Sequence, residues 1–235
     1  MSNIPENMKP AITDLILAIA DDKLILGHRN SDWTGLGPIL EEDIAFSSLA
    51  QDEIAHASAF YDLLESITGR KANEYAFGRT AQEYRCAAIV EVPDEFDWAT
   101  AIARQFYCDH YDWLRLNRLA ESTYEPLAHL TRRIAAEEYV HVEHSSQWVI
   151  RLGQGTEESS TRMQKALTAL GPTSLWLFEP YDGLQELVDE KIYPGSDFKM
   201  FDAWEKSILD VVSRAGLSIS FEIGSPDNHG GRRGV

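Results

Sequence analysis

Two Glu-x-x-His pairs are the residues of this sequence best suited to chemistry. Glu53 precedes His56 by three residues, and Glu138 precedes His141 by the same interval. On an α-helix this spacing puts a carboxylate and an imidazole on one face, within reach of a single ion. One such pair from each of two helices, with one carboxylate from each of two others, forms the di-iron and di-manganese sites of helical bundles. The pattern therefore predicts a metal site with two further acidic ligands.

Both pairs interrupt rows of apolar residues. The row on a helix predicted over residues 39–67 runs Phe46, Leu49, Glu53, His56, Phe60, Leu63 and Leu64. The row on a helix predicted over residues 124–152 runs Leu127, Leu130, Ile134, Glu138, His141, Ser145 and Trp148. Because a buried carboxylate without a partner is costly, we expect a metal ion or hydrogen bonds to compensate these acids.

Two aspartates are the candidates for the remaining ligands. Asp109 lies in the apolar row of a helix predicted over residues 94–122, and Asp21 lies in a helix predicted over residues 10–28. The two halves have similar intervals, since Asp21 comes 32 residues before Glu53 and Asp109 comes 29 before Glu138. The predicted ligand set is Asp21, Glu53, His56, Asp109, Glu138 and His141.

Alternatives remain open at this site. Asp22 is an alternative ligand to Asp21, and Glu137 is an alternative to Glu138. The whole set could instead be a vestige without metal, in which neutral histidines and hydrogen-bonded or protonated carboxylates specify how the helices pair. Aspartate at the first and third positions, shorter than the glutamate expected there, favours this metal-free interpretation.

Composition limits the class of protein. The 235 residues, 44% of them hydrophobic, suffice for one domain over residues 1–235. A net charge of -17 argues against a nucleic-acid partner. The chain has only two cysteines, Cys86 and Cys108, and they do not have CxxC spacing. This usage is typical of a protein from a reducing compartment. We find neither a signal peptide nor a run of about 18 apolar residues, and therefore expect a cytoplasmic protein that does not span a membrane.

The order of the predicted elements indicates an all-α fold. The four long helices fall into two pairs separated by a long connection, which is the ferritin-like four-helix bundle with a long crossover. Additional C-terminal helices are predicted over residues 160–170 and 200–214. From about residue 222 the chain is rich in glycine and charge, and we expect a flexible or truncated tail.

Five blocks of the sequence resemble the structural subunits of phenylacetyl-CoA epoxidases, a family within the ferritin-like superfamily. They are IADDKLILGHRNSDWTG at 19–35, LEEDIAFSSLAQDEIAHA at 40–57, IARQFYCD at 102–109, EEYVHVEHSSQWVIRLGQGTEES at 137–159 and GGRRG at 230–234. The blocks occur in the family's order with similar separations and span almost the whole chain.

The resemblance implies a non-catalytic role in a multicomponent monooxygenase. Members of that family support a homologous catalytic di-iron subunit, alongside a small bridging subunit and a reductase, in the epoxidation of the aromatic ring of phenylacetyl-CoA. A second copy of the chain is a further candidate partner. Familiar structural members have lost much of the iron-ligand set, whereas both Glu-x-x-His pairs are present here. The alternative prediction is therefore a di-iron oxygenase or oxidase subunit in its own right.

Overall fold

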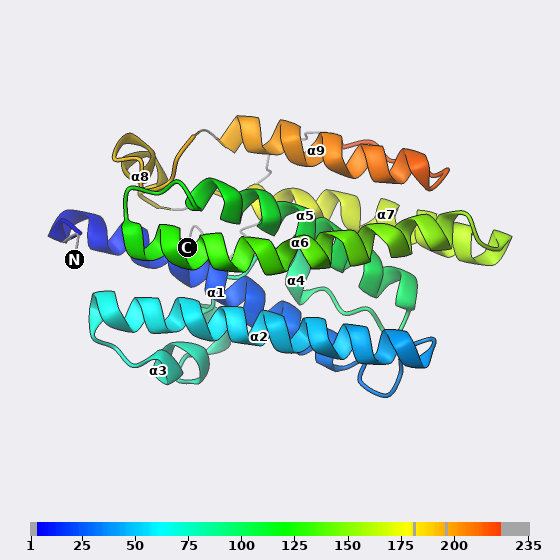
Figure 1. Cartoon of the computed structure of the whole chain (residues 1–235), viewed down its shortest axis with the longest axis horizontal. Helices are drawn as coiled ribbons and strands as arrows, with labels where there is room; N and C mark the ends of the chain where they lie inside the picture. The colour runs from blue at the N-terminus through cyan, green and yellow to red at the C-terminus, as the bar shows by residue number, and fades with distance from the viewer. Residues whose placement is uncertain (1–3, 181, 196, 222–235) are drawn as a thin grey trace.

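The computed structural model describes residues 4–180, 182–195 and 197–221, and within these ranges every regular element is a helix (Figure 1). The four longest are α1 (Lys9–Ser31), α2 (Leu40–Thr68), α5 (Trp98–Leu119) and α6 (Glu125–Gly153). Helix α1 packs along α2 and α5 packs along α6, so that two hairpin pairs form the bundle. The predicted all-α fold is confirmed, with helix ends close to those expected. The tail predicted from about residue 222 lies outside the described residues.

Local sequence signals explain where the long helices begin and end. Pro10 and Pro126 stand in the first turns of α1 and α6, where a missing backbone N–H costs nothing. Asp97 caps α5 by accepting a hydrogen bond from the backbone N–H of Thr100. Gly69 ends α2 in a left-handed conformation, with φ of 78°, that favours glycine.

The crossover between α2 and α5 contains two short helices, α3 (Ala72–Phe77) and α4 (Ala88–Glu91). Hydrogen bonds from this segment to α1 hold it in place. The Asp21 carboxylate accepts from the backbone N–H of Arg85 at 2.6 Å, and Asp22 accepts from that of Ala87 at 2.7 Å. The two aspartates of α1 therefore fix the crossover to the bundle.

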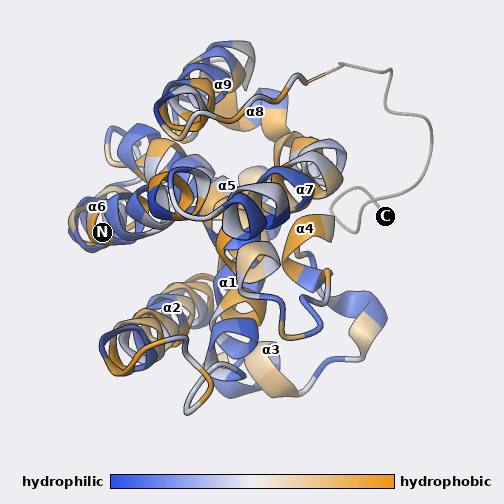
Figure 2. Ribbon diagram, turned by 90° about the vertical axis from the view of Figure 1, so that its right-hand side faces the viewer, coloured by the Kyte–Doolittle hydropathy of each residue, from blue (hydrophilic) through white to orange (hydrophobic). Residues whose placement is uncertain are grey.

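Three further helices cover one side of the bundle (Figure 2). They are α7 (Glu157–Ser174), α8 (Leu184–Asp189) and α9 (Asp197–Arg214). Helices α7 and α9 both pack against α5 and α6. The additional C-terminal helices are thus present, but α7 continues beyond the predicted end at residue 170, because packing against α5 outweighs the poor helix propensity of Gly171 and Pro172.

The apolar core of the bundle is divided in two. One cluster includes Phe46 and Trp148, and the other includes Phe60 and Leu127. The two Glu-x-x-His pairs lie between these clusters along α2 and α6, since the apolar rows resume on both sides of them. Apolar packing at both ends therefore shields the polar middle from water. Among the described residues, no helix combines the length and apolar character needed to span a membrane.

A first prediction concerns the close approach of α1 and α2 at Gly27. A Cβ at this position would lie 2.8 Å from Ile54 Cγ1 and 3.1 Å from the carbonyl oxygen of Ala50. We expect Gly27→Ala to lower the free energy of unfolding by about 1–3 kcal/mol, because the two helices must move apart. The matched control is Gly171→Ala in α7, where the nearest atoms are 3.9 Å away. It should be neutral or stabilising by up to about 1 kcal/mol. Urea unfolding measures both, and equal effects would contradict the tight α1–α2 contact.

Candidate functional site

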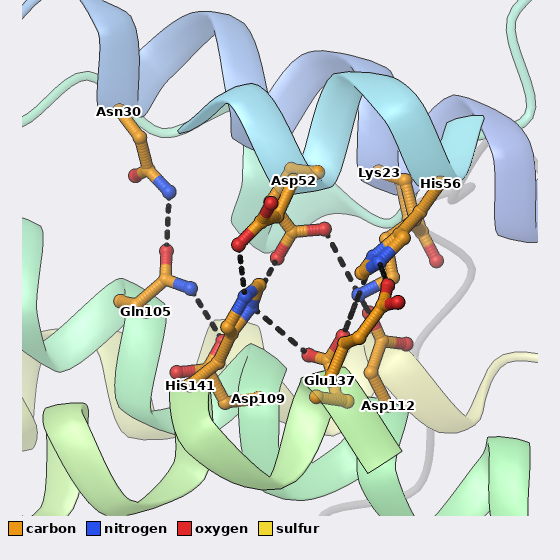
Figure 3. A network of polar contacts seen from close by, with 12 residues as sticks. Lys23, Asn30, Asp52, His56, Gln105, Asp109, Asp112, Glu137 and His141 are labelled. Atoms are coloured by element: carbon orange, nitrogen blue, oxygen red, sulfur yellow. Dashed lines mark hydrogen bonds and ion pairs between the residues drawn. The ribbon is translucent and has the colours of Figure 1, made fainter. Parts of the chain in front are cut away.

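Eight buried polar side chains from four helices form a layer across the middle of the bundle, called here the charged layer (Figure 3). Its members are Lys23 from α1, Glu53 and His56 from α2, Asp109, Asp112 and Arg115 from α5, and Glu138 and His141 from α6. Each is at most 3% exposed to solvent. Charges so deeply buried must neutralise one another or bind an ion.

The Lys23 ammonium is the centre of this layer. Its Nζ atom lies 2.5 Å from Glu138 Oε2, 2.9 Å from Glu53 Oε2 and 3.0 Å from Asp112 Oδ2. Burial opposes the ammonium charge, but the three carboxylates outweigh it and raise the pKa of Lys23 well above its ordinary value. A protonated side chain therefore occupies a cation position between the two glutamates.

The structure corrects the prediction that α1 contributes Asp21 or Asp22 to the site. Asp21 accepts hydrogen bonds from Arg79 Nη2 at 2.5 Å and from Tyr61 Oη at 2.6 Å, away from the other predicted ligands. Asp22 Oδ2 accepts from Arg115 Nη1 at 3.1 Å. Successive residues of a helix point about 100° apart, so Lys23, two positions after Asp21, faces the site instead. Helix α1 thus contributes a positive charge where the spacing predicted a negative one.

Four of the six predicted ligands do come together. Glu53, Asp109, Glu138 and His141 each place one ligand atom within 4.8 Å of the others. His141 Nδ1 lies 3.4 Å from Glu53 Oε1 and 3.8 Å from Glu138 Oε1. These four side chains could hold a metal ion.

The fifth, His56, lies at the edge of the charged layer. Its Nε2 atom is 2.7 Å from Glu137 Oε2, and its Nδ1 atom is 3.9 Å from Glu138 Oε2. The open choice between Glu137 and Glu138 is resolved by burial, because Glu138 lies inside the layer whereas the Glu137 side chain is 53% exposed. Asp52 occupies the corresponding position beside His141, with its Oδ2 atom 3.6 Å from Nε2. Each histidine is therefore shared between a buried carboxylate and a more exposed one.

Proton binding differs among the buried acids. Burial opposes ionisation of Glu53, but Lys23 and His141 outweigh it and hold the pKa of that carboxyl well below its usual range. Burial, together with the charge of Glu138, raises the pKa of Asp109 well above its usual value. Burial raises the pKa of Glu138 to about 7, with Lys23 opposing the shift. Burial disfavours the charged form of His141, but Glu138 and Glu53 raise its pKa to about 10. Protons and the ammonium together balance the carboxylates.

Polar residues beyond the predicted set complete the layer. Asn30 Nδ2 donates to Gln105 Oε1 at 2.7 Å, and Gln105 Nε2 donates to Asp109 (Figure 3). Arg115 pairs with Asp112 and Asp22. Sequence reasoning missed Lys23 and Arg115, although Lys23 is a cation whose neighbours one turn away on the helix are Ile19, Ala20, Leu26 and Gly27. That cation in an apolar stretch is the signal by which Lys23 could have been noticed.

The charged layer does not fit a centre of two metal ions as it stands. Such a centre needs two cation positions bridged by carboxylates. Here the Oε2 atoms of both Glu53 and Glu138 contact the Lys23 ammonium. Donors without a hydrogen bond, including Asp109 Oδ2 and His141 Nδ1, belong to the group of four side chains that could hold one ion at the other position.

Comparison with known proteins shows the family. The model of the family described as phenylacetic acid catabolic protein matches residues 1–234. The chain belongs to this family. Among curated proteins, it is 28% identical over 225 residues to one of the subunits of the 1,2-phenylacetyl-CoA epoxidase of Escherichia coli strain K12, a match that covers 95% of this chain and 89% of the relative. The resemblance seen in the sequence blocks is therefore confirmed, and the charged layer is a feature of a phenylacetic acid catabolic protein.

A second prediction tests the ammonium at the centre of the layer. Lys23→Met should lower the free energy of unfolding by about 3–5 kcal/mol at pH 7, because it leaves buried carboxylates without their cation. Without the ammonium, the pKa of Glu53 should rise above its unfolded value, and that of Glu138, already raised to about 7, should rise further. The folded variant then binds more protons than the unfolded chain, so its deficit should shrink as the pH falls toward 5.

The matched control is Lys71→Met, since Lys71 pairs with Glu65 at 2.6 Å on the surface, with a side chain that is 70% exposed. Screening by water leaves such a pair with little effect. Urea unfolding of both variants at pH 7 and pH 5 makes the comparison. A Lys23→Met variant as stable as Lys71→Met at pH 7 would contradict the role given to the ammonium.

Proposed function

We propose that this chain is a structural, non-catalytic subunit of a multicomponent phenylacetyl-CoA epoxidase in aerobic phenylacetate catabolism. The family and the name of the Escherichia coli relative support the placement in such a complex. The observation that carries the non-catalytic role is the Lys23 ammonium between Glu53 and Glu138. Its proposed partners are a homologous di-iron catalytic subunit, a small bridging subunit and a reductase in the cytoplasm.

The chemistry of oxygen activation explains why the ammonium matters. A catalytic di-iron centre needs bridging carboxylates and open coordination positions for dioxygen. In this chain one oxygen of each glutamate already contacts Lys23, and the layer is closed by apolar clusters on both sides. Its residues are arranged to hold four helices together.

One outer face of α2 supports the proposed docking to another subunit. Its most exposed residues over positions 44–58 are all uncharged, and this neutral face of α2 consists of Ile44, Ser48, Gln51, Ile54, Ala55 and Ser58. Such a stretch is unusual on a chain with net charge -17. The half-exposed carboxylate of Asp52 borders this face and lies beside His141. Helix α2 lies at the outside of the bundle (Figure 2). A face depleted of charge is typical of the centre of a protein interface, which suits packing against a second helical bundle.

A second candidate function is a di-iron oxygenase or oxidase subunit with its own metal centre. The convergence of Glu53, Asp109, Glu138 and His141 favours it, because these four could hold a metal ion. In this case His56 and Lys23 would have to move before a second ion could bind. The two candidates therefore differ in whether the glutamates are needed for turnover.

The third prediction separates these candidates in the assembled complex. The variants are Glu53→Gln/Glu138→Gln, and the same pair combined with Lys23→Met so that both signs of charge are removed together. We expect epoxidation of phenylacetyl-CoA per catalytic subunit to stay within about twofold of the wild type, because in the scaffold role these glutamates take no part in turnover. Assembly of the complexes is matched by size-exclusion chromatography. Loss of turnover by more than about a hundredfold in assembled complexes, with about two irons lost from this chain, would establish the second candidate.

A fourth prediction tests the neutral face of α2. Ala55→Arg should weaken binding to the catalytic subunit at least about tenfold, which is about 1.4 kcal/mol, because an interface without charge must desolvate the new guanidinium. Ala169→Arg is the matched control, since Ala169 is an exposed alanine on α7, outside this face. Co-purification and a titration by calorimetry measure both. Equal affinities in the two variants, with unchanged thermal unfolding, would exclude this face as the interface.

A further inference from the structure

In each of the two glutamates of the charged layer, the two carboxylate oxygens have different neighbours. Their Oε2 atoms face Lys23 Nζ, at 2.9 Å from Glu53 and 2.5 Å from Glu138. Their Oε1 atoms face His141, with Nδ1 at 3.4 Å and 3.8 Å. Lys23 and His141 therefore contact different oxygens of the two carboxylates, and Figure 3 shows these two side chains apart from each other. The layer thus contains one position filled by an ammonium and a second one next to it.

Donor atoms without hydrogen bonds converge on the second position. They are Glu53 Oε1, Asp109 Oδ2, Glu138 Oε1 and His141 Nδ1, all on side chains at most 1% exposed. Leaving one buried polar atom without a partner costs about 1–3 kcal/mol. Four at one place indicate a site built for a ligand that accepts one nitrogen and three oxygens as donors.

The charge of the layer indicates the sign of that ligand. Its four carboxylates are Glu53, Asp109, Asp112 and Glu138, and its two permanent cations are Lys23 and Arg115. Arg115 is also shared with a further acid, Asp22. Carboxylates therefore outnumber the permanent cations, and a metal cation that binds here would displace the protons that otherwise balance them.

We propose that this chain binds one divalent transition-metal ion through Glu53, Asp109, Glu138 and His141, with the Lys23 ammonium as a fixed cation beside it. Imidazole and carboxylate ligands suit zinc, manganese or ferrous iron. The metal ligands come from α2, α5 and α6 and the ammonium comes from α1, so the pair of cations joins all four helices of the bundle. Four protein ligands complete a tetrahedral shell, as in structural metal sites. This inference goes beyond the non-catalytic role and is compatible with it.

Lys23 limits the number of ions to one. A metal ion at its position would need the same Glu53 and Glu138 oxygens that the ammonium contacts. If the ammonium is removed, His56 Nδ1, which is buried without a hydrogen bond and 3.9 Å from Glu138 Oε2, becomes available to that position. The shortened side chain of Lys23→Met should therefore convert the layer to a site for two ions.

The experiment measures metal stoichiometry. The whole chain is freed of metal with a chelator and supplied with Zn²⁺ or Co²⁺, both as folded protein and during refolding, since the layer is closed. Bound metal is counted by mass spectrometry, and the Co²⁺ visible spectrum reports coordination. We expect one ion in the wild type and two in Lys23→Met. Asp109→Asn and His141→Gln, which each remove a ligand, should lower the affinity at least about tenfold. Binding should raise the unfolding temperature of the wild type.

The matched control is His144→Gln. His144 lies one turn after His141 on α6 and pairs with Glu42 at 2.8 Å near the surface, outside the layer. It should bind one ion with unchanged affinity. A folded wild type that binds no ion would overturn this inference and leave the proposed scaffold role intact. Two ions in the wild type would overturn both. A single ion that survives in Asp109→Asn and His141→Gln but is lost in His144→Gln would place it at the surface and also overturn the inference.

Discussion

The contact of one ammonium with three carboxylates is the constraint on which the rest of this bundle depends. Lys23 Nζ touches acids from α2, α5 and α6, and its own helix is α1, so a single charged group ties the four long helices together. The surrounding apolar clusters exclude water from it. In that environment, removing either the ammonium or its carboxylates costs far more stability than at the surface. The contact therefore favours one register of the helices and a lysine at position 23.

The same contact distinguishes the proposed scaffold role of this chain from that of a catalytic subunit. A helical bundle that activates dioxygen uses its central carboxylates to bridge two metal ions. Here two of those carboxylates, Glu53 and Glu138, bridge a lysine instead, while their remaining oxygens face His141. In the proposed scaffold role, the chain would keep the helical architecture of an oxygen-activating subunit and use its polar centre for cohesion. Membership of the phenylacetic acid catabolic protein family supplies the context in which such a subunit would support a catalytic one.

Much of the fold could be predicted from the sequence, because long apolar rows, helix-capping residues and Gly69 act locally. Glu138 and His141 meet for the same reason, since Glu-x-x-His spacing fixes one helix face, and Glu53 and Asp109 join them because they interrupt the apolar rows of α2 and α5. The contribution of α1 could not be predicted that way. Asp21 and Lys23 differ by two positions in a stretch whose apolar residues surround the helix on all sides, so periodicity does not show which of them faces the centre. Asp21 faces Tyr61 of α2 and, in the crossover, Arg79 and the backbone N–H of Arg85, all of them distant in sequence.

The most direct test is a crystal structure of the chain purified from iron-replete cells, with anomalous diffraction recorded at the iron edge. We expect the Lys23 side chain in density between Glu53 and Glu138, with no iron peak at its Nζ position. Two iron peaks bridged by these glutamates, with Lys23 turned away, would contradict the central role of the ammonium and make this chain an oxygen-activating subunit.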